Sequence, residues 1–238
     1  MNDPPATAAG YLPAGAAVNA AAPHEPALSI PDLARGFGIE EVLHFTTNRG
    51  LVGIGATGAV KSRDGLTADA YLEHIYLPNC RSRTGDAGWT GYVNLSLTQV
   101  NGTLLGISKD RWHVADEVWW CVLAFDPALL SHDGVYFTTT NNIYPAVKRG
   151  QGGAGLSALY ADKVPGRYGN LSCRTAHTPR NLPTDPQAEV LYPDQVELGL
   201  LRRIYVPEDD YIDAVKGLAA TLPSLSGIPI ECKPEVFG

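Results

Sequence analysis

The segment PTDPQAEVLYP, residues 183–193, carries a glutamate at the start of an apolar stretch. The Val-Leu-Tyr run after Glu189 predicts a buried strand. Gln187 and Glu189 are two residues apart, so they should project to the same face where this strand begins. A carboxylate beside such a run can be positioned and partly desolvated, and it could stabilise a developing cation or accept a proton. Taken alone, however, a solvent-exposed glutamate is the simpler interpretation.

Around this segment, the predicted strands and helices follow one another in irregular order. Apolar runs and alternation predict strands at 41–47, 91–100, 118–126, 134–142, 188–193 and 201–207. Helices are predicted at 29–39, 48–54, 67–77, 156–164 and 209–222, with a mobile glycine-rich loop at 149–155. The stretch VWWCVLAFD, 118–126, is apolar almost throughout, which favours a central strand. Elements mixed in this way indicate an α+β fold.

The composition indicates a folded chain. Of the 238 residues, 45% are hydrophobic and 18% charged, which excludes a wholly disordered protein. No stretch approaches the roughly 18 apolar residues of a membrane span. Residues 1–27 are rich in Ala and Pro and lack the basic start of a secretory signal. We therefore expect a flexible leader over 1–27, a single domain over 28–238, and a cytoplasmic protein without membrane contact.

The charge is distributed unevenly along the chain. The net charge is −7, which argues against a protein that binds nucleic acid over its whole surface. Residues 148–180, however, contain six basic side chains and one acidic one, a net +5 that leaves −12 for the remainder. A local basic segment on an acidic body can bind a phosphate backbone at one place. A solvated loop is equally compatible with the charge alone.

Several familiar motifs are absent or incomplete. Gly53-x-Gly55-x-x-Gly58 matches the glycine pattern of a dinucleotide-binding turn, but it lacks the preceding strand and the long following helix. Cys121 lies inside the apolar stretch 118–126, which favours packing over nucleophilic catalysis. The six histidines do not cluster at ligand spacings and the four cysteines form no CxxC pair, so we expect no metal site.

The tripeptide His44-Phe45-Thr46 ends the strand predicted at 41–47. A ring nitrogen and a hydroxyl at a strand end can hold a ribose or an amide. A lone histidine at a strand end is more often structural than functional. The other segments of the chain, described next, favour the functional role for His44.

Six segments follow one another along the chain in a characteristic order: HFTT with GLVGI (44–54), YVNLSLTQVN (92–101), WWCVLAFDP (119–127), FTTTNN (137–142), LSALYADKV (156–164) and PTDPQAEVLYP (183–193). Together they resemble the DarT family, the DNA ADP-ribosyltransferase toxins of DarT–DarG toxin–antitoxin systems. The resemblance runs from about Val42 to Val206. It implies an ADP-ribosyltransferase-type fold with a split central β-sheet and flanking helices.

The resemblance also implies residue roles. Glu189 looks like the catalytic acid, and the segment 79–89 offers two candidates for a family arginine, of which we favour Arg83 over Arg81 as catalytic. The residues implied to bind NAD⁺ are His44, Phe45, Thr46, Arg81, Ser96 and Gln187. Those expected to bind DNA are Arg149, Tyr160, Lys163, Arg167, Arg174 and Arg180, with Tyr160 or Tyr168 stacking an unpaired base.

The implied reaction transfers ADP-ribose from NAD⁺ to a base of single-stranded DNA. NAD⁺ is then a co-substrate, and neither a tightly bound cofactor nor a metal is required. Loss of nicotinamide builds positive charge on the ribose, which Glu189 could stabilise. The base must be accessible, so single-stranded DNA is the expected partner. The resemblance further implies a toxin, a role in phage defence, and a DarG-type antitoxin that removes the ADP-ribose.

The target base is predicted from the family branch. YVNLSLT (92–98) and HDGVYFTTTNN (132–142) resemble the guanine-modifying branch, and NRG (48–50) stands where thymine-modifying relatives usually have a longer segment. Guanine is therefore the predicted acceptor. The alternatives are a thymine-specific enzyme, transfer to RNA, simple NAD⁺ hydrolysis, and a non-catalytic nucleic-acid-binding module. The intact His44 and Glu189 argue against the last of these.

Overall fold

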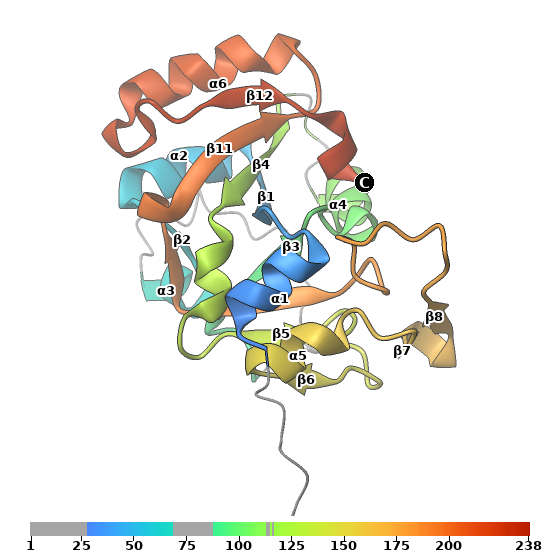
Figure 1. Cartoon of the computed structure of the whole chain (residues 1–238). Helices are drawn as coiled ribbons and strands as arrows, with labels where there is room; N and C mark the ends of the chain where they lie inside the picture. The colour runs from blue at the N-terminus through green and yellow to red at the C-terminus, as the bar shows by residue number, and fades with distance from the viewer. Residues whose placement is uncertain (1–27, 69–87, 113–114, 116) are drawn as a thin grey trace, which may run out of the picture.

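The computed structural model describes residues 28–68, 88–112, 115 and 117–238. Its central sheet has eight strands in the order β12-β11-β4-β1-β3-β9-β5-β6 (Figure 1). Their bounds are β1 Val42–Thr47, β3 Tyr92–Leu97, β4 Trp120–Phe125, β5 Tyr136–Thr138, β6 Arg149–Gly150, β9 Glu189–Pro193, β11 Leu201–Val206 and β12 Ile230–Cys232. Neighbouring strands run antiparallel, except for the parallel pair β11–β12. The predicted α+β class is confirmed, and the sheet differs from the parallel sheet of a dinucleotide-binding fold.

The sheet is split between β1 and β3. These strands pair only at Val42–Leu97 and Leu43–Ser96, whereas β1 pairs with β4 along its whole length. We call β12-β11-β4-β1 the β4 half and β3-β9-β5-β6 the β9 half. The two halves are therefore joined by one short stretch of ladder, and a seam opens beyond it.

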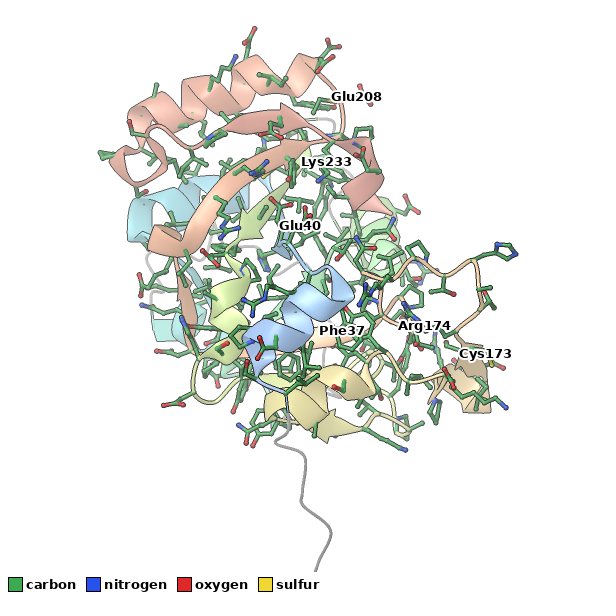
Figure 2. All side chains as sticks on the ribbon, viewed as in Figure 1. Phe37, Glu40, Cys173, Arg174, Glu208 and Lys233 are labelled. Carbon is green, nitrogen blue, oxygen red and sulfur yellow. The ribbon has the colours of Figure 1, made fainter. Side chains whose placement is uncertain are left out.

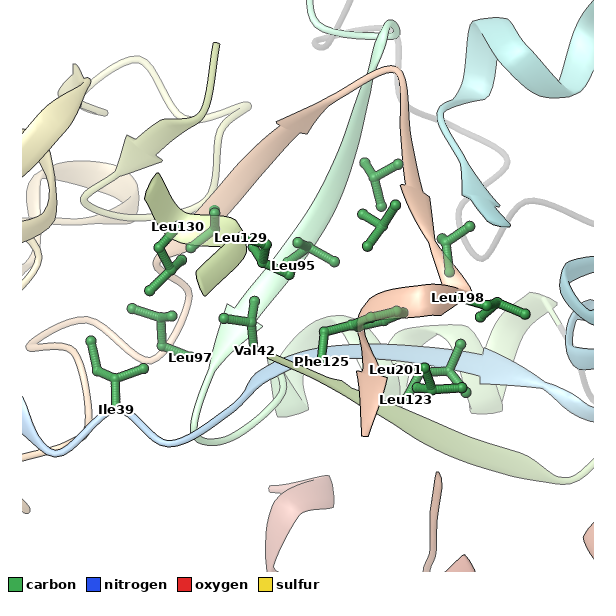
Figure 3. Packing of buried hydrophobic residues seen from close by; sticks show 14 of the residues in the cluster. Ile39, Val42, Leu95, Leu97, Leu123, Phe125, Leu129, Leu130, Leu198 and Leu201 are labelled. Atoms are coloured by element: carbon green, nitrogen blue, oxygen red, sulfur yellow. The ribbon is translucent and has the colours of Figure 1, made fainter. Parts of the chain in front are cut away.

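One face of the sheet carries the larger core cluster and most of the helices. The helices are α1 Ile30–Phe37, α2 Asn48–Thr57, α5 Gly152–Ala158 and α6 Asp210–Thr221. Figure 3 shows Val42, Leu123 and Phe125 packed within this cluster. Ser29 starts α1 by accepting a hydrogen bond from the Asp32 N–H, and a left-handed glycine ends it. Local capping thus sets the helix, and burial of its inner side holds it on the sheet.

On the other face, a smaller apolar cluster covers the β4 half. There, Leu43 and Val122 pack against Leu105 of α4 (Gly102–Ile107) and Phe237 of the C-terminal turn Pro234–Phe237. Because both of its faces are covered, every residue of β4 is buried, as the apolar run predicts.

The glycine-rich segment differs from the prediction. Residues 149–155 form β6 and the start of α5 rather than a mobile loop, and α5 ends at Ala158 rather than continuing to 164. A Cβ on Gly155 would lie 2.5 Å from the Gly150 carbonyl oxygen, and one on Gly153 would lie 2.7 Å from the Leu28 oxygen. The glycines therefore allow the helix backbone to approach its neighbours closely.

Shorter elements complete the described chain. They are β2 Ala59–Lys61 paired with β10 Gln195–Glu197, β7 Lys163–Pro165 paired with β8 Leu171–Cys173, and α3 Arg63–Ala68. Single turns of helix occupy Ser108–Trp112, Pro127–Ser131, Arg167–Gly169, Leu198–Leu200 and Pro223–Leu225. Most of the helix predicted at 67–77, and the leader 1–27, lie outside the described residues. Among the helices that are described, none has the length and apolar character to cross a membrane.

Candidate active site

Glu189 is the first residue of β9, and only 3% of its surface is exposed. The Asn142 backbone N–H donates to its Oε2 at 2.8 Å, and the Asn141 side-chain amide lies 3.5 Å from Oε1. The Glu189 backbone N–H donates to the Thr138 hydroxyl at 3.2 Å. A buried carboxylate that accepts N–H groups is held in one direction. Glu189 is thus positioned rather than solvent-exposed.

Three side chains of the β9 half share a face with this carboxylate. Thr138 of β5 is paired with Glu189 on one side and with Arg149 on the other. β3 pairs with β9 as far as Leu95 and Val190, and Ser96 and Glu189 are the next residues along the two strands. Directly paired residues present their side chains to the same face. Ser96, Glu189, Thr138 and Arg149 therefore form a row across four neighbouring strands.

His44 lies at the seam between the two halves. Its Nδ1 is 3.1 Å from the Asn94 carbonyl oxygen. Because a carbonyl can only accept, Nδ1 donates and Nε2 remains an acceptor in the neutral ring. Burial lowers the pKa of His44 below its ordinary value of 6.5, and the bond to Asn94 opposes that shift only in part. The neutral ring at pH 7 can therefore accept a hydrogen bond from a hydroxyl.

Phe45 and Thr46 point to opposite faces of β1, and Thr46 shares the face of His44. Phe45 is on the face of Ser96 and packs its ring on Trp120, with the ring centroids 5.8 Å apart. Thr46 is buried on the other face, where a side chain on Gly50 of α2 would overlap its hydroxyl. The His44 ring thus contacts β3 across the seam from the face it shares with Thr46, whereas Phe45 lies on the face of Ser96 and Glu189. Arg81 and Arg83 lie outside the described residues.

Gln187 is held in a turn that precedes β9. Its backbone N–H donates to Asp185 Oδ1 at 2.8 Å, and its side-chain oxygen accepts from the Tyr144 hydroxyl at 2.8 Å. Asp185 is buried and also accepts from the Ser172 hydroxyl of β8 at 3.0 Å. Asp185 therefore ties the β7–β8 hairpin to the segment that leads into Glu189.

The basic segment divides into exposed and engaged side chains. Lys163, Arg167 and Arg180 are exposed. Tyr168 is 84% exposed and adopts a positive φ of 57°. The Arg167 guanidinium lies over the rings of both Tyr168, at 4.5 Å, and Tyr144, at 5.7 Å. This part of the hairpin presents positive charge and an aromatic face together.

Tyr160 and Arg174 occupy other surroundings than expected. The Tyr160 ring is 8% exposed and is stacked on Phe37 with a centroid separation of 3.9 Å. Arg174, labelled with Phe37 in Figure 2, donates to three backbone oxygens of residues 179–182 and lies over the Tyr160 ring. The expectation that Tyr160 stacks a base is not met, because its ring is already packed. The Arg174 guanidinium therefore stabilises the loop that follows it, residues 175–182, rather than facing solvent.

Arg149 also turns its guanidinium towards the protein. Its Nε and Nη2 both donate to Asn142, each at 2.7 Å, although the residue as a whole is exposed.

Sequence reasoning missed the residues that hold the carboxylate. Thr138, Thr139, Thr140, Asn141 and Asn142 are all buried. They belong to the run FTTTNN (137–142), which the sequence places in a predicted strand and in the family resemblance without a role for its polar side chains. Five polar residues directly after an apolar strand could have indicated a buried hydrogen-bonded loop. Asp185, another missed residue, lies within the segment 183–193 itself.

The other motifs have structural roles. Gly53 and Gly55 lie inside α2 and Gly58 ends it in a left-handed conformation, with Gly55 packed tightly against Leu222. Burial raises the pKa of the Cys121 thiol to about 12, so it is protonated at neutral pH. Among the described residues, no three His, Cys, Asp or Glu side chains gather in a way that could hold a metal.

Comparison with solved structures supports the fold. Thermus sp. 2.9 DarT in complex with NAD⁺ matches with a TM-score of 0.58 and 14% identity over 84% of this chain and 98% of that one. The same protein in complex with ADP-ribosylated ssDNA gives a TM-score of 0.55 at 14% identity, over 84% and 97% of the two chains. Thermosipho africanus DarTG in complex with ADP-ribose gives 0.50 at 15% identity, over 83% of this chain and 51% of that one. No curated protein matches.

The family comparison covers nearly the whole described chain. The family model described as "ssDNA thymidine ADP-ribosyltransferase, DarT" matches residues 43–238. This range includes β1, the seam and Glu189. The family model and the fold comparison both indicate DarT proteins. The chain belongs to the DarT family of NAD⁺-dependent DNA ADP-ribosyltransferases.

Proposed function

We propose that this protein transfers ADP-ribose from NAD⁺ to a base of single-stranded DNA, with Glu189 as the catalytic carboxylate. The observation that carries the proposal is the buried Glu189, fixed by the Asn142 N–H and lying beside Ser96. Membership of the DarT family supports the reaction class. The solved Thermus sp. 2.9 DarT complexes with NAD⁺ and with ADP-ribosylated ssDNA support the choice of substrates.

The reaction breaks one bond at the ribose and forms another. The bond between C1′ and nicotinamide breaks, and nicotinamide leaves with the electron pair. Glu189 stabilises the positive charge that develops on the ribose, in a protein environment that strengthens electrostatic interactions. A base nitrogen then forms the new bond to C1′, and its proton passes to the Glu189 carboxylate.

The remaining NAD⁺ contacts are proposed around the seam. The Nε2 of His44 accepts a hydrogen bond from a ribose hydroxyl, as its neutral tautomer allows. Phe45, Thr46, Ser96 and Gln187 are the other proposed binding residues, and Arg83 with Arg81 is proposed to hold the pyrophosphate or the Glu189 carboxylate.

The proposed DNA surface is the hairpin surface, comprising Lys163, Arg167, Tyr168 and Arg180. Its three cations suit a phosphate backbone, and the exposed Tyr168 ring suits an unpaired base. The surface is fastened to the catalytic segment through Asp185, which bonds both Ser172 and Gln187. A strand bound there would be held at a constant distance from Glu189.

Guanine is the proposed acceptor, on the resemblance of segments 92–98 and 132–142 to the guanine-modifying branch. A second candidate is thymine, because the matching family model is described as a thymidine ADP-ribosyltransferase. The two differ only in the base that reaches the ribose and leave the reaction unchanged.

The test incubates the full chain with NAD⁺ and pairs of oligonucleotides in which either guanine or thymine is the sole difference. The products are read by mass. A mass gain of one ADP-ribose on the guanine strand is expected. Gain on the thymine strand alone overturns the base, free ADP-ribose without gain supports hydrolysis, and binding without turnover supports a non-catalytic module. Gain on RNA alone overturns the choice of DNA.

The hairpin surface is tested by the salt dependence of DNA binding. Replacing Lys163, Arg167 and Arg180 together by Gln should flatten the slope of log affinity against log salt by about 0.7 for each lost phosphate contact. A matched variant replaces three exposed cations elsewhere, Arg35, Arg63 and Lys216, by Gln. Equal slopes for the two variants would remove the hairpin surface from the DNA site.

We further propose that residues 28–238 act as one domain and that the protein works in the cytoplasm. A DarG-type partner that removes ADP-ribose is proposed from family membership and from the Thermosipho africanus DarTG match. Co-expression with such a hydrolase should relieve the toxicity that the DNA modification causes.

A further inference from the structure

We propose that Arg149 is a positioning residue for Glu189: it holds Asn142, the residue whose backbone N–H sets the direction of the catalytic carboxylate. The inference rests on the proposed function and deepens it. It also changes the sequence-based expectation for Arg149, which was a contact with DNA phosphate.

The geometry joins Arg149 to Glu189 through a single residue. Arg149 donates from Nε to the Asn142 side-chain oxygen and from Nη2 to the Asn142 backbone oxygen, each at 2.7 Å. Asn142 is 1% exposed, and its N–H lies 2.8 Å from Glu189 Oε2. The two Arg149 bonds restrain both the side chain and the backbone of Asn142. The donor that faces Glu189 therefore has little freedom to rotate.

The sheet register brings the two ends of this chain of contacts together. Thr138 is paired with both Glu189 and Arg149, so the two charged side chains lie on one face, on strands separated only by β5. At the start of the connection from β5 to β6, the Thr139 N–H donates to the Lys148 carbonyl oxygen at 3.0 Å. This closure folds the loop back, and Asn142 lies between the carboxylate and the guanidinium.

The choice of arginine has a physical reason. The planar guanidinium offers donors in a fixed fork, which matches the two Asn142 oxygens and which a lysine ammonium does not reproduce. The Arg149 guanidinium also lies over the Trp89 ring, 5.1 Å from its centroid. Trp89 thus supports the guanidinium while Asn142 receives its bonds.

A positioning role predicts which kinetic constant changes. Loss of the fork should leave Glu189 misdirected, and misplacement by about 1 Å can cost about 10²-fold in rate. We expect turnover at saturating NAD⁺ and DNA to fall about 10- to 100-fold in Arg149→Ala. Arg149→Lys should fall by a similar factor, because retained charge does not restore the fork.

The experiment measures kcat and KM for the oligonucleotide, with thermal midpoints to verify folding. Lys148→Ala is the matched control, since it removes the neighbouring exposed cation, and any effect should fall on KM. Asn142→Ala keeps the backbone N–H but removes one anchor, so a smaller fall in kcat is expected. Adding it to Arg149→Ala should cost little more, because both changes disturb the same contact.

Two results would overturn the inference. One is full rescue of kcat by Arg149→Lys, and the other is a loss in Arg149→Ala that is confined to KM and accompanied by a flatter salt slope. Either result would indicate that Arg149 contacts DNA rather than positions Glu189. Failure of the proposed function is recognised separately, because the wild-type protein would then give no mass gain on DNA.

Discussion

The two halves of the sheet bury different kinds of side chain. In the β4 half, all six residues of β4 are apolar and buried, and both faces are covered by core clusters. In the β9 half, the buried set includes Glu189, Ser96 and the polar run from Thr138 to Asn142. The β4 half therefore gains most of its stability from buried apolar side chains, whereas the β9 half also has several buried polar groups that need partners.

This difference indicates that the β4 half mainly stabilises the fold, whereas the β9 half positions the Glu189 carboxylate. Buried polar groups cost free energy unless they are hydrogen-bonded. Most side chains of the run from Thr138 to Asn142 are bonded, whereas the Thr140 hydroxyl has no partner among the described residues. In the β9 half those bonds converge on Glu189: Thr138 bonds its backbone, and Asn141 and Asn142 bond its carboxylate. Changes in the β4 half should therefore reduce stability, and changes in the β9 half should reduce turnover.

The largest expected effect tests the β9 half directly. Glu189→Gln keeps the size of the side chain but removes the charge that would stabilise the ribose cation. Transfer should fall at least about 10²-fold, to background in an ordinary assay. The thermal midpoint should remain near that of the wild type, because the core is untouched. Transfer is read by mass on an oligonucleotide, and wild-type turnover in this variant would contradict the catalytic role of Glu189.

The next effect is on stability in the β4 half. Leu123 is fully buried in the larger cluster and pairs with His44 across the ladder. Leu123→Ala should lower the free energy of unfolding by about 2–5 kcal/mol, because it removes apolar contact and leaves a cavity. Chemical denaturation measures the loss. Turnover per folded molecule should be nearly unchanged at low temperature, and a selective loss of turnover would break the division between the halves.

A smaller effect is expected where α5 meets β6. Gly155→Ala places a Cβ 2.5 Å from backbone atoms of Gly150, and the overlap should destabilise the fold by about 1–3 kcal/mol. Gly217→Ala in α6 is the matched control, since no atom lies within 4 Å of its Cβ. It should stabilise by about 0.5–1 kcal/mol. Equal denaturation midpoints for the two variants would contradict the close approach of α5.

The smallest effect concerns pH at the seam. Because the folded pKa of His44 is depressed, the unfolded chain binds a proton that the folded chain excludes as the pH falls below about 6.5. His44 should therefore contribute a loss of stability towards acid pH and none above neutrality. The thermal midpoint of His44→Gln should fall less between pH 7.5 and 5.5 than that of the wild type. His177→Gln, at an exposed position, is the control. Parallel curves for His44→Gln and wild type would contradict burial as the cause.

The sequence predicted the central elements because their signals are local. β4 was recognisable from its apolar run, α1 from its capping residues and α6 from its amphipathic pattern. The failures occurred where local propensity was overridden. Glycines at 153 and 155 favour a loop by propensity, yet they form a helix because their lack of side chains permits close packing against Leu28 and Gly150.

For the candidate site, the sequence determined the chemistry but left the arrangement open. A carboxylate before an apolar run, a histidine at a strand end and the family resemblance led to the proposal of Glu189 and His44 from short stretches of chain. Only the tertiary structure decided that Arg149 turns inward to Asn142, that Tyr160 is packed on Phe37 and that Tyr168 is exposed. These outcomes depend on strand register and on contacts between residues far apart in sequence. A charge count or a periodicity contains neither, because both describe neighbours along the chain rather than neighbours in space.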